Sequence, residues 1–260
     1  MSIWKRPFFR PDGAGPFPLV VINHGLDSGS PAFQVRTRYP AIAQEFLKRG
    51  YAVVLPMRRG FSKSEGVLID TGCSYSANGR AGAKDIEGVI GWLRQQSWAD
   101  ASRILVVGQS HGGLASLALA EDNVPGVKAI LNFAGGLHGG GADDCHWESA
   151  LKSAFSTYGS DAKIESMWFY GSNDRLFEPS LVQQLYRRYT EAGGKAELID
   201  YGAFGVDAHG MFGTQTGFDT IWWPKAKPFF SQPWFTGRNR PSGSIWWPSG
   251  TFSQWICWPP

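Results

Sequence analysis

The clearest chemical signal in the chain is a serine enclosed by small residues. Residues 108–113 (Gly-Gln-Ser-His-Gly-Gly) follow a short apolar run of strand length and precede a stretch with helical character. A serine hydroxyl becomes a useful nucleophile only when a sharp turn exposes it beside a general base. Small residues two positions before and two positions after Ser110 leave room for such a strained turn. We therefore predict that Ser110 is a catalytic nucleophile.

An activated serine needs a histidine within hydrogen-bond reach, and that histidine needs an orienting carboxylate. The five histidines are His24, His111, His138, His146 and His209. His209 lies in Asp-Ala-His-Gly at 207–210, after the last strand-like run and downstream of every candidate acid. The other four lie near the first parallel strand, on the serine turn itself or in the glycine-rich segment after residue 133. Residue type alone leaves all five histidines open as the base.

Six short apolar runs alternate with longer stretches of helical periodicity. That alternation predicts a parallel sheet covered by helices. The runs lack a strict polar–apolar alternation, as expected for strands buried on both faces. The strand-like runs are residues 18–23, 51–56, 103–108, 127–133, 166–171 and 196–201. The helical stretches are residues 38–49, 79–96, 114–120 and 181–192, with Asn78 as the expected N-cap of the second.

Five segments, in this order, resemble the α/β-hydrolase superfamily, and specifically the dienelactone-hydrolase-like serine hydrolases. They are Val-Val-Ile-Asn-His-Gly at 20–25, Arg-Gly-Phe-Ser-Lys-Ser-Glu-Gly at 59–66, the turn around Ser110, Phe-Tyr-Gly-Ser-Asn-Asp at 169–174 and Asp-Ala-His-Gly at 207–210. The resemblance implies an α/β-hydrolase fold, with a mostly parallel central sheet flanked by helices on both faces. Because Met1 lies shortly before the first parallel strand, we expect the antiparallel strands that usually open this fold to be missing.

The resemblance also implies a catalytic triad in the chain order nucleophile, acid, base. That order corresponds to Ser110, Asp174 and His209. Asp174 ends the segment at 169–174, and the loop one strand earlier contains no carboxylate. Glu178 and Asp207 remain weaker candidates for the acid.

The oxyanion hole is expected to consist of two backbone N–H groups, from His111 and from Leu26. We expect the side chain of His24 to hold the Leu26 loop. No cofactor or metal is expected, because the cluster that follows residue 137 does not have the spacing of a standard zinc site. Its members are His138, Asp143, Asp144, Cys145, His146 and Glu148. The glycine run at 139–141 instead predicts a loop over the active site.

These features predict a serine hydrolase that cleaves a carboxylic ester or lactone of a small molecule through an acyl-enzyme. Ser110 stands where the founding dienelactone hydrolases have a cysteine, which argues against dienelactone itself as the substrate. Three alternatives remain open. They are an acyltransferase with the same triad, a peptidase with the same triad, and a non-catalytic binding protein on this fold.

Composition excludes several other classes. Hydrophobic residues make up 43% of the chain, which excludes global disorder. The net charge is only +3 and no Lys/Arg run exceeds two residues, so a nucleic-acid partner is not expected. No apolar stretch approaches the roughly 18 residues of a membrane span.

The sequence leaves the cellular compartment open: cytoplasmic as the sequence stands, periplasmic or secreted if a leader has been lost. Cys73 and Cys145 could pair, which would indicate an oxidising compartment, or remain free thiols.

We predict a catalytic domain over residues 1–230 and a Trp/Pro-rich tail over residues 231–260. The last forty residues hold seven of the twelve tryptophans and seven of the sixteen prolines, without a helical or strand period. Proline at this frequency prevents a compact core. We therefore expect the tail to be extended or irregular, with an aromatic surface for a flat ligand as the alternative.

Overall fold

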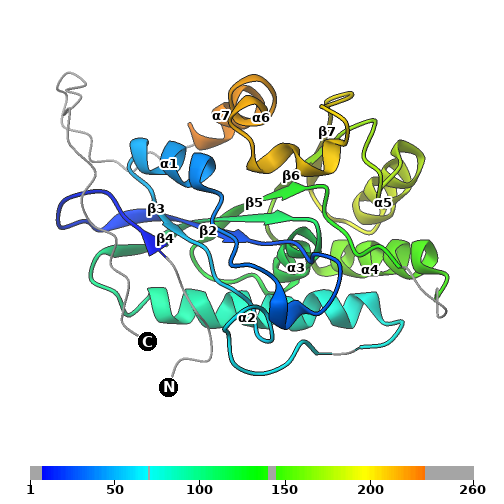
Figure 1. Ribbon diagram of the computed structural model, residues 1–260, viewed down its shortest axis with the longest axis horizontal. Helices are drawn as coiled ribbons and strands as arrows, with labels where there is room; N and C mark the ends of the chain where they lie inside the picture. Colours follow the sequence, from blue (N-terminus) through cyan, green and yellow to red (C-terminus); the bar gives the residue numbers. More distant parts are fainter. Residues whose placement is uncertain (1–7, 70, 140–144, 232–260) are drawn as a thin grey trace.

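The computed structural model of the chain describes residues 8–69, 71–139 and 145–231. A seven-stranded sheet lies at its centre, in the order β1-β3-β2-β4-β5-β6-β7 (Figure 1). Neighbouring strands are parallel except for β1, which runs antiparallel to β3. The strands are β1 (Phe8–Phe9), β2 (Phe17–Asn23), β3 (Ala52–Val54), β4 (Ala99–Gln109), β5 (Val127–Phe133), β6 (Ser166–Tyr170) and β7 (Ala196–Asp200). The prediction of a mostly parallel sheet is confirmed.

The sheet contains a short antiparallel strand that the sequence analysis did not predict. Phe8 of β1 pairs with Val54 of β3, and Phe9 pairs with Val53. Two residues are too few to show a period of two, so no pattern in the sequence could reveal this strand. The expectation that the fold lacks its antiparallel opening strands is therefore wrong in part, because one such strand is present.

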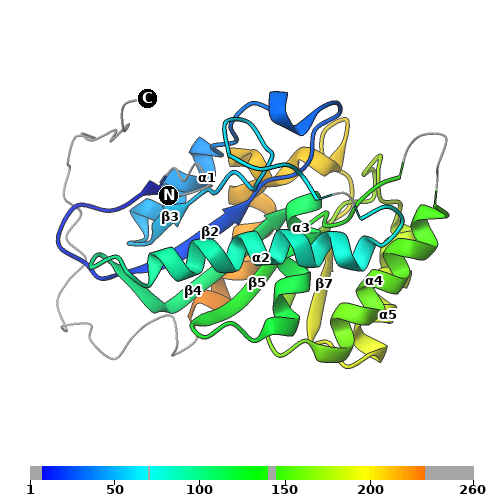
Figure 2. The same ribbon diagram turned by 90° about the horizontal axis from the view of Figure 1, so that it is seen from below.

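Helices cover both faces of the sheet (Figures 1 and 2). One face carries α2 (Tyr75–Leu93), α3 (His111–Leu119), α4 (Trp147–Asp161) and α5 (Pro179–Glu191), and the other carries α1 (Pro40–Lys48), α6 (Gln215–Gly217) and α7 (Trp223–Phe230). Successive side chains of a strand point to opposite faces, so Val21 of β2 joins the first core and Val20 joins the second. The central strands are buried on both sides, which explains their unbroken apolar runs.

Two helices differ from the sequence prediction. α2 begins at Tyr75, and the hydroxyl of Ser74 accepts a hydrogen bond from the helix, so Asn78 is an interior residue and not the N-cap. α4 lies where the sequence analysis predicted no helix. Its buried residues include Leu151, Phe155 and Tyr158, at the helical spacings of four and three. The glycine-rich approach to α4 and its mixed polar composition hide this short apolar face.

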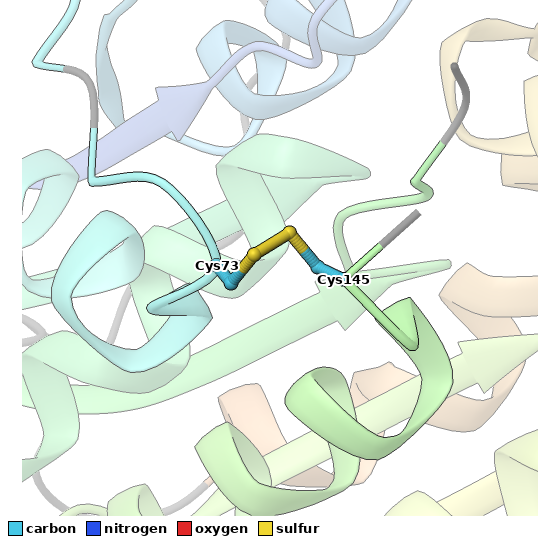
Figure 3. Close-up of a disulfide and its surroundings, with 2 residues drawn as sticks. All are labelled: Cys73 and Cys145. Atoms are coloured by element: carbon cyan, nitrogen blue, oxygen red, sulfur yellow. A yellow bond between two sulfur atoms is a disulfide. The ribbon is translucent and has the colours of Figure 1, made fainter. Parts of the chain in front are cut away.

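Cys73 and Cys145 form a disulfide, so the structure contains the bridge and not two free thiols (Figure 3). The bridge joins the segment before α2 to the segment before α4, across 72 positions of sequence. Cross-linking distant positions restricts the unfolded chain and contributes roughly 2–4 kcal/mol to stability. Bridges of this kind persist in oxidising compartments.

The last described helix ends at the predicted domain boundary. Phe230 closes α7 and is largely buried, with its ring 6.0 Å from that of Phe46 and 5.0 Å from that of Trp223. The predicted tail lies outside the described residues beyond Ser231, so the boundary stays a prediction. Within the described residues, no helix combines the length and the apolar character needed to cross a bilayer.

Candidate active site

Ser110 lies on the turn between β4 and α3, where the sequence analysis placed it. Its backbone has φ 54° and ψ −124°, a conformation that non-glycine residues rarely adopt. A Cβ atom on Gly108 would collide with the carbonyl oxygen of Gly112, and one on Gly112 would collide with the backbone of Asn23. The Ser110 N–H donates to the carbonyl oxygen of Phe133 at 3.0 Å. Close packing that only glycine permits, together with this hydrogen bond, holds the strained turn.

His209 and Asp174 are in direct contact. The Nδ1 atom of His209 lies 3.0 Å from Oδ2 and 3.2 Å from Oδ1 of Asp174. A neutral imidazole that donates from Nδ1 to this carboxylate has the lone pair of Nε2 available to accept a hydrogen bond. The Asp174 side chain is fully buried, and its Oδ1 also accepts from the N–H groups of Leu176 at 2.9 Å and Phe177 at 3.1 Å. The pair has the arrangement of an imidazole held ready to accept a proton.

Gln109 connects this pair to the serine turn. Its Nε2 atom donates to the carbonyl oxygen of His209 at 3.2 Å. The ring of Phe177 lies 5.7 Å from that of His209 and packs against Gly136, whose N–H donates to the Ser110 carbonyl oxygen. The structure therefore brings the three predicted triad residues, from segments after β4, β6 and β7, to one edge of the sheet.

The two weaker candidates for the acid have other surroundings. Asp207 accepts hydrogen bonds at Oδ1 from the backbone N–H groups of His209, at 2.9 Å, and Arg175, at 3.3 Å. Its carboxylate thus joins the segment after Asp174 to the segment that carries His209. Glu178 is exposed at the N-terminus of α5. Within the described residues, Asp174 is the candidate whose carboxylate contacts the His209 ring.

The two predicted oxyanion donors lie on segments that flank Ser110. His111 is the first residue of α3, so its backbone N–H has no acceptor within the helix. Leu26 is half-buried and follows Gly25, which packs closely on the serine turn. A Cβ atom on Gly25 would lie 2.7 Å from Oε1 of Gln109 and 3.2 Å from Cβ of Ser110. Both segments therefore adjoin the predicted nucleophile.

Next to these segments lies a buried arginine that the sequence analysis missed. Arg58 is 2% exposed. It donates from Nη1 to the carbonyl oxygen of His24 at 2.7 Å and from Nη2 to Nδ1 of His111 at 3.0 Å. Its backbone N–H donates to Nε2 of His24 at 3.2 Å. The only available signal was a charged residue directly after an apolar run.

Both histidines are neutral in this network. The Arg58 groups can only donate, so each ring accepts at one nitrogen and carries its proton on the other. His24 then donates from Nδ1 to the carbonyl oxygen of Gly25 at 2.7 Å, and His111 donates from Nε2 to Oδ1 of Asn78 at 2.6 Å. The predicted structural role of His24 agrees with these contacts.

We expect the free energy of unfolding to fall as the pH drops below about 6.5. Burial first, and the charge on Arg58 second, lower the pKa of both His24 and His111 well below its ordinary value. Between about pH 6.5 and the lowered values, the unfolded chain binds two protons that the folded chain does not. Stability is therefore lost toward acid pH, by up to about 2.7 kcal/mol per pH unit.

Urea unfolding between about pH 5.5 and 8 measures this slope. A His111→Asn variant is the control, because it removes one of the two protons and should halve the slope. An unfolding free energy that stays constant in the unmodified protein across this range would contradict the neutral pair.

Tyr39 is another residue near the serine turn that the sequence analysis missed. It precedes α1 with φ 40°, and its hydroxyl donates to Oε1 of Gln109 at 3.4 Å. Burial first, and the negative charge of Asp27 second, raise the pKa of Tyr39, so the phenol is neutral. The contact joins residues 70 positions apart, so local sequence patterns could not predict it.

Two members of the His, Cys and acid cluster around the start of α4, which was not expected to bind a metal, have other partners. Cys145 is in the disulfide, and the ring of His138 lies 4.4 Å from that of Trp147. Asp143 and Asp144 lie outside the described residues, as do residues 140 and 141 of the predicted active-site loop. No group of three or more His, Cys, Asp or Glu side chains suited to a metal occurs in the part of the chain that the structure describes.

The sheet order, its helical layers and the serine turn between β4 and α3 define the α/β-hydrolase fold. Solved structures agree. A dienelactone hydrolase from Klebsiella pneumoniae superposes with a TM-score of 0.61 at 17% identity, covering 87% of this chain and 92% of that one. The acylaminoacyl peptidase of Pyrococcus horikoshii superposes with a TM-score of 0.62 at 15% identity, covering 88% of this chain and 40% of that one. The predicted α/β-hydrolase fold is confirmed.

Sequence comparison places the chain within that superfamily. The family model of the X-Pro dipeptidyl-peptidases (S15 family) matches residues 5–166, more than half of the chain, and the chain belongs to this family. The cocaine esterase of Rhodococcus sp. (strain MB1 Bresler) is 30% identical over 122 residues, which are 47% of this chain and 19% of that protein. The chain thus spans about a fifth of the length of this relative.

Proposed function

We propose that the protein is a carboxylic-ester hydrolase that works through an acyl-enzyme on Ser110. The observation that carries the proposal is the hydrogen-bonded pair of His209 and Asp174, which Gln109 links to a strained strand-to-helix turn with Ser110 at its tip. A nucleophile, a base and an orienting carboxylate are the three groups that acyl transfer requires.

In the proposed mechanism, Oγ of Ser110 attacks the ester carbonyl carbon while Nε2 of His209 takes its proton. The buried carboxylate of Asp174 stabilises the imidazolium that forms. The negative oxygen of the tetrahedral intermediate accepts hydrogen bonds from the N–H groups of His111 and Leu26. His209 then protonates the leaving alcohol, and a water molecule activated by the same imidazole releases the acid.

Two findings bear on the choice between ester and amide substrates. The cocaine esterase supports an ester, since its name states that activity and it is 30% identical over 122 residues. The family name supports a peptidase that releases X-Pro dipeptides, which is the second candidate. We favour the ester because the triad and oxyanion donors alone suffice for an activated ester, whereas an X-Pro peptidase must also recognise the substrate amino terminus.

A fluorophosphonate probe and two substrate sets test the proposal. We expect one probe adduct on the peptide that contains Ser110 and turnover of p-nitrophenyl esters with short to medium acyl chains. An X-Pro p-nitroanilide should react at least about 100-fold more slowly, a difference of about 2.7 kcal/mol in transition-state stabilisation. Faster cleavage of the anilide would establish the peptidase instead. A protein that neither binds the probe nor turns over any substrate would be a binding protein on this fold.

A further inference from the structure

Arg58 is a buried cation that makes no direct ion pair with a carboxylate in the described part of the chain. The carboxylate of Asp85 is hydrogen-bonded to the neighbouring Arg59, whose Nε lies 2.6 Å from its Oδ1, and acts on Arg58 only through its charge. Arg58 instead contacts a carbonyl oxygen, a neutral imidazole and the ring of Phe61, whose centroid is 5.1 Å from the guanidinium carbon. Burial lowers the pKa of Arg58 to about 10, so the group remains charged near neutral pH. Burying such a group is costly, and a structural role alone could be met by an apolar side chain.

The two polar partners of Arg58 belong to the two halves of the predicted oxyanion hole. The carbonyl oxygen of His24, which accepts from Nη1, lies two residues before Leu26. The imidazole of His111, which accepts from Nη2, belongs to the residue whose backbone N–H starts α3. These segments follow β2 and β4 and are 87 positions apart in sequence, counted from His24 to His111. One rigid guanidinium therefore spans both.

We propose that Arg58 is the positioning residue of the oxyanion hole: it ties the loop after β2 to the start of α3 and places a positive charge behind the two N–H donors. This inference rests on the proposed function, because it assumes that Ser110 forms a tetrahedral intermediate there. Donors that are fixed in advance stabilise a developing oxyanion most when they do not have to reorganise. A nearby cation in a dry site adds to that stabilisation.

Three variants separate positioning, charge and general structure. Arg58→Met removes both the hydrogen bonds to the two oxyanion segments and the positive charge. Arg58→Lys keeps the charge, but a single ammonium cannot reproduce the fork that reaches both partners. Arg59→Met is the matched control, since it removes an adjacent arginine whose partner is Asp85 and not the oxyanion segments.

Each variant is first titrated with the fluorophosphonate, so that rates refer to intact active sites. Then kcat and KM for a neutral ester and the affinity for phenylboronic acid, which binds a serine as a tetrahedral adduct, are measured. We expect Arg58→Met to lower kcat and boronate affinity in parallel, by about 10²–10³-fold, with KM little changed. Arg58→Lys should lose about 10-fold in both, and Arg59→Met less than about 3-fold.

The inference is overturned if the kcat loss disappears after titration, if it equals that of Arg59→Met, or if boronate affinity is unchanged. Should Arg58→Met fail to fold, the parallel loss in Arg58→Lys decides the question alone. Failure of the proposed function looks different, because the unmodified protein would then neither react with the phosphonate nor hydrolyse the ester.

Discussion

Replacing Ser110 with alanine is expected to lower kcat for a short p-nitrophenyl ester by about 10⁴–10⁶-fold. The variant lacks the only atom that can form the acyl-enzyme, so His209 and Asp174 have no hydroxyl to activate. The fold should survive, because alanine also carries a Cβ and adds no new clash at φ 54°. The measurement is the steady-state turnover of the ester by the variant. A thermal melting curve that matches that of the unmodified protein shows that the variant is folded.

Ser116 provides the matched control for this experiment. It is a buried serine of α3 whose hydroxyl donates to the carbonyl oxygen of Gly112 at 2.8 Å and accepts from Asn23 at 3.1 Å. Ser116→Ala should lower stability by about 1 kcal/mol and leave kcat within a few-fold. If Ser110→Ala kept more than a few per cent of the activity, the nucleophile would have to be another residue.

Asp174→Asn is expected to lower kcat by about 10⁴-fold. The asparagine oxygen can still accept from the N–H groups of Leu176 and Phe177, which directs the amide nitrogen toward His209. A donor at that position forces Nδ1 of the imidazole to accept, which moves the ring proton to Nε2. The histidine then cannot take the proton of Ser110. The pH–rate profile and kcat, measured with an activated ester, report this change.

The Asp207→Asn variant makes the same chemical change at the competing candidate. Its side-chain oxygen can still accept from the backbone of His209 and Arg175, so we expect kcat to fall by less than about 10-fold. Equal losses in Asp174→Asn and Asp207→Asn would remove the reason for assigning Asp174 as the acid.

Features encoded by neighbouring residues could be predicted from the sequence. The serine turn is one, because the six residues around Ser110, with a strand before and a helix after, contain both the nucleophile and the small residues that its backbone needs. The alternation of apolar runs and helical stretches likewise predicts the parallel sheet, because strands buried on both faces must be continuously apolar. The chain order of nucleophile, acid and base that the resemblance implies then identified Asp174 as the candidate acid and His209 as the candidate base. Their catalytic roles stay predictions.

Local patterns failed where an element was too short or its apolar face was masked by composition. The two residues of β1 cannot display a period, and their pairing with β3 joins positions more than 40 residues apart. In α4, polar residues separate the buried apolar residues in the sequence, and a glycine-rich segment precedes the helix. Both elements are stabilised by packing against distant parts of the sheet and its helices, which outweighs weak local preference.

Only the tertiary structure decided which side chains meet. Asp174 and His209 are 35 positions apart, Arg58 and His111 are 53 apart, and the two bridged cysteines are 72 apart. The sequence alone does not show which of these residues are in contact. It left Asp207 and Glu178 open as alternatives for the acid, and it left free thiols open as the alternative to the disulfide. The physical reason is that strand order and register determine which loops share an edge of the sheet, and they are set by packing over the whole chain.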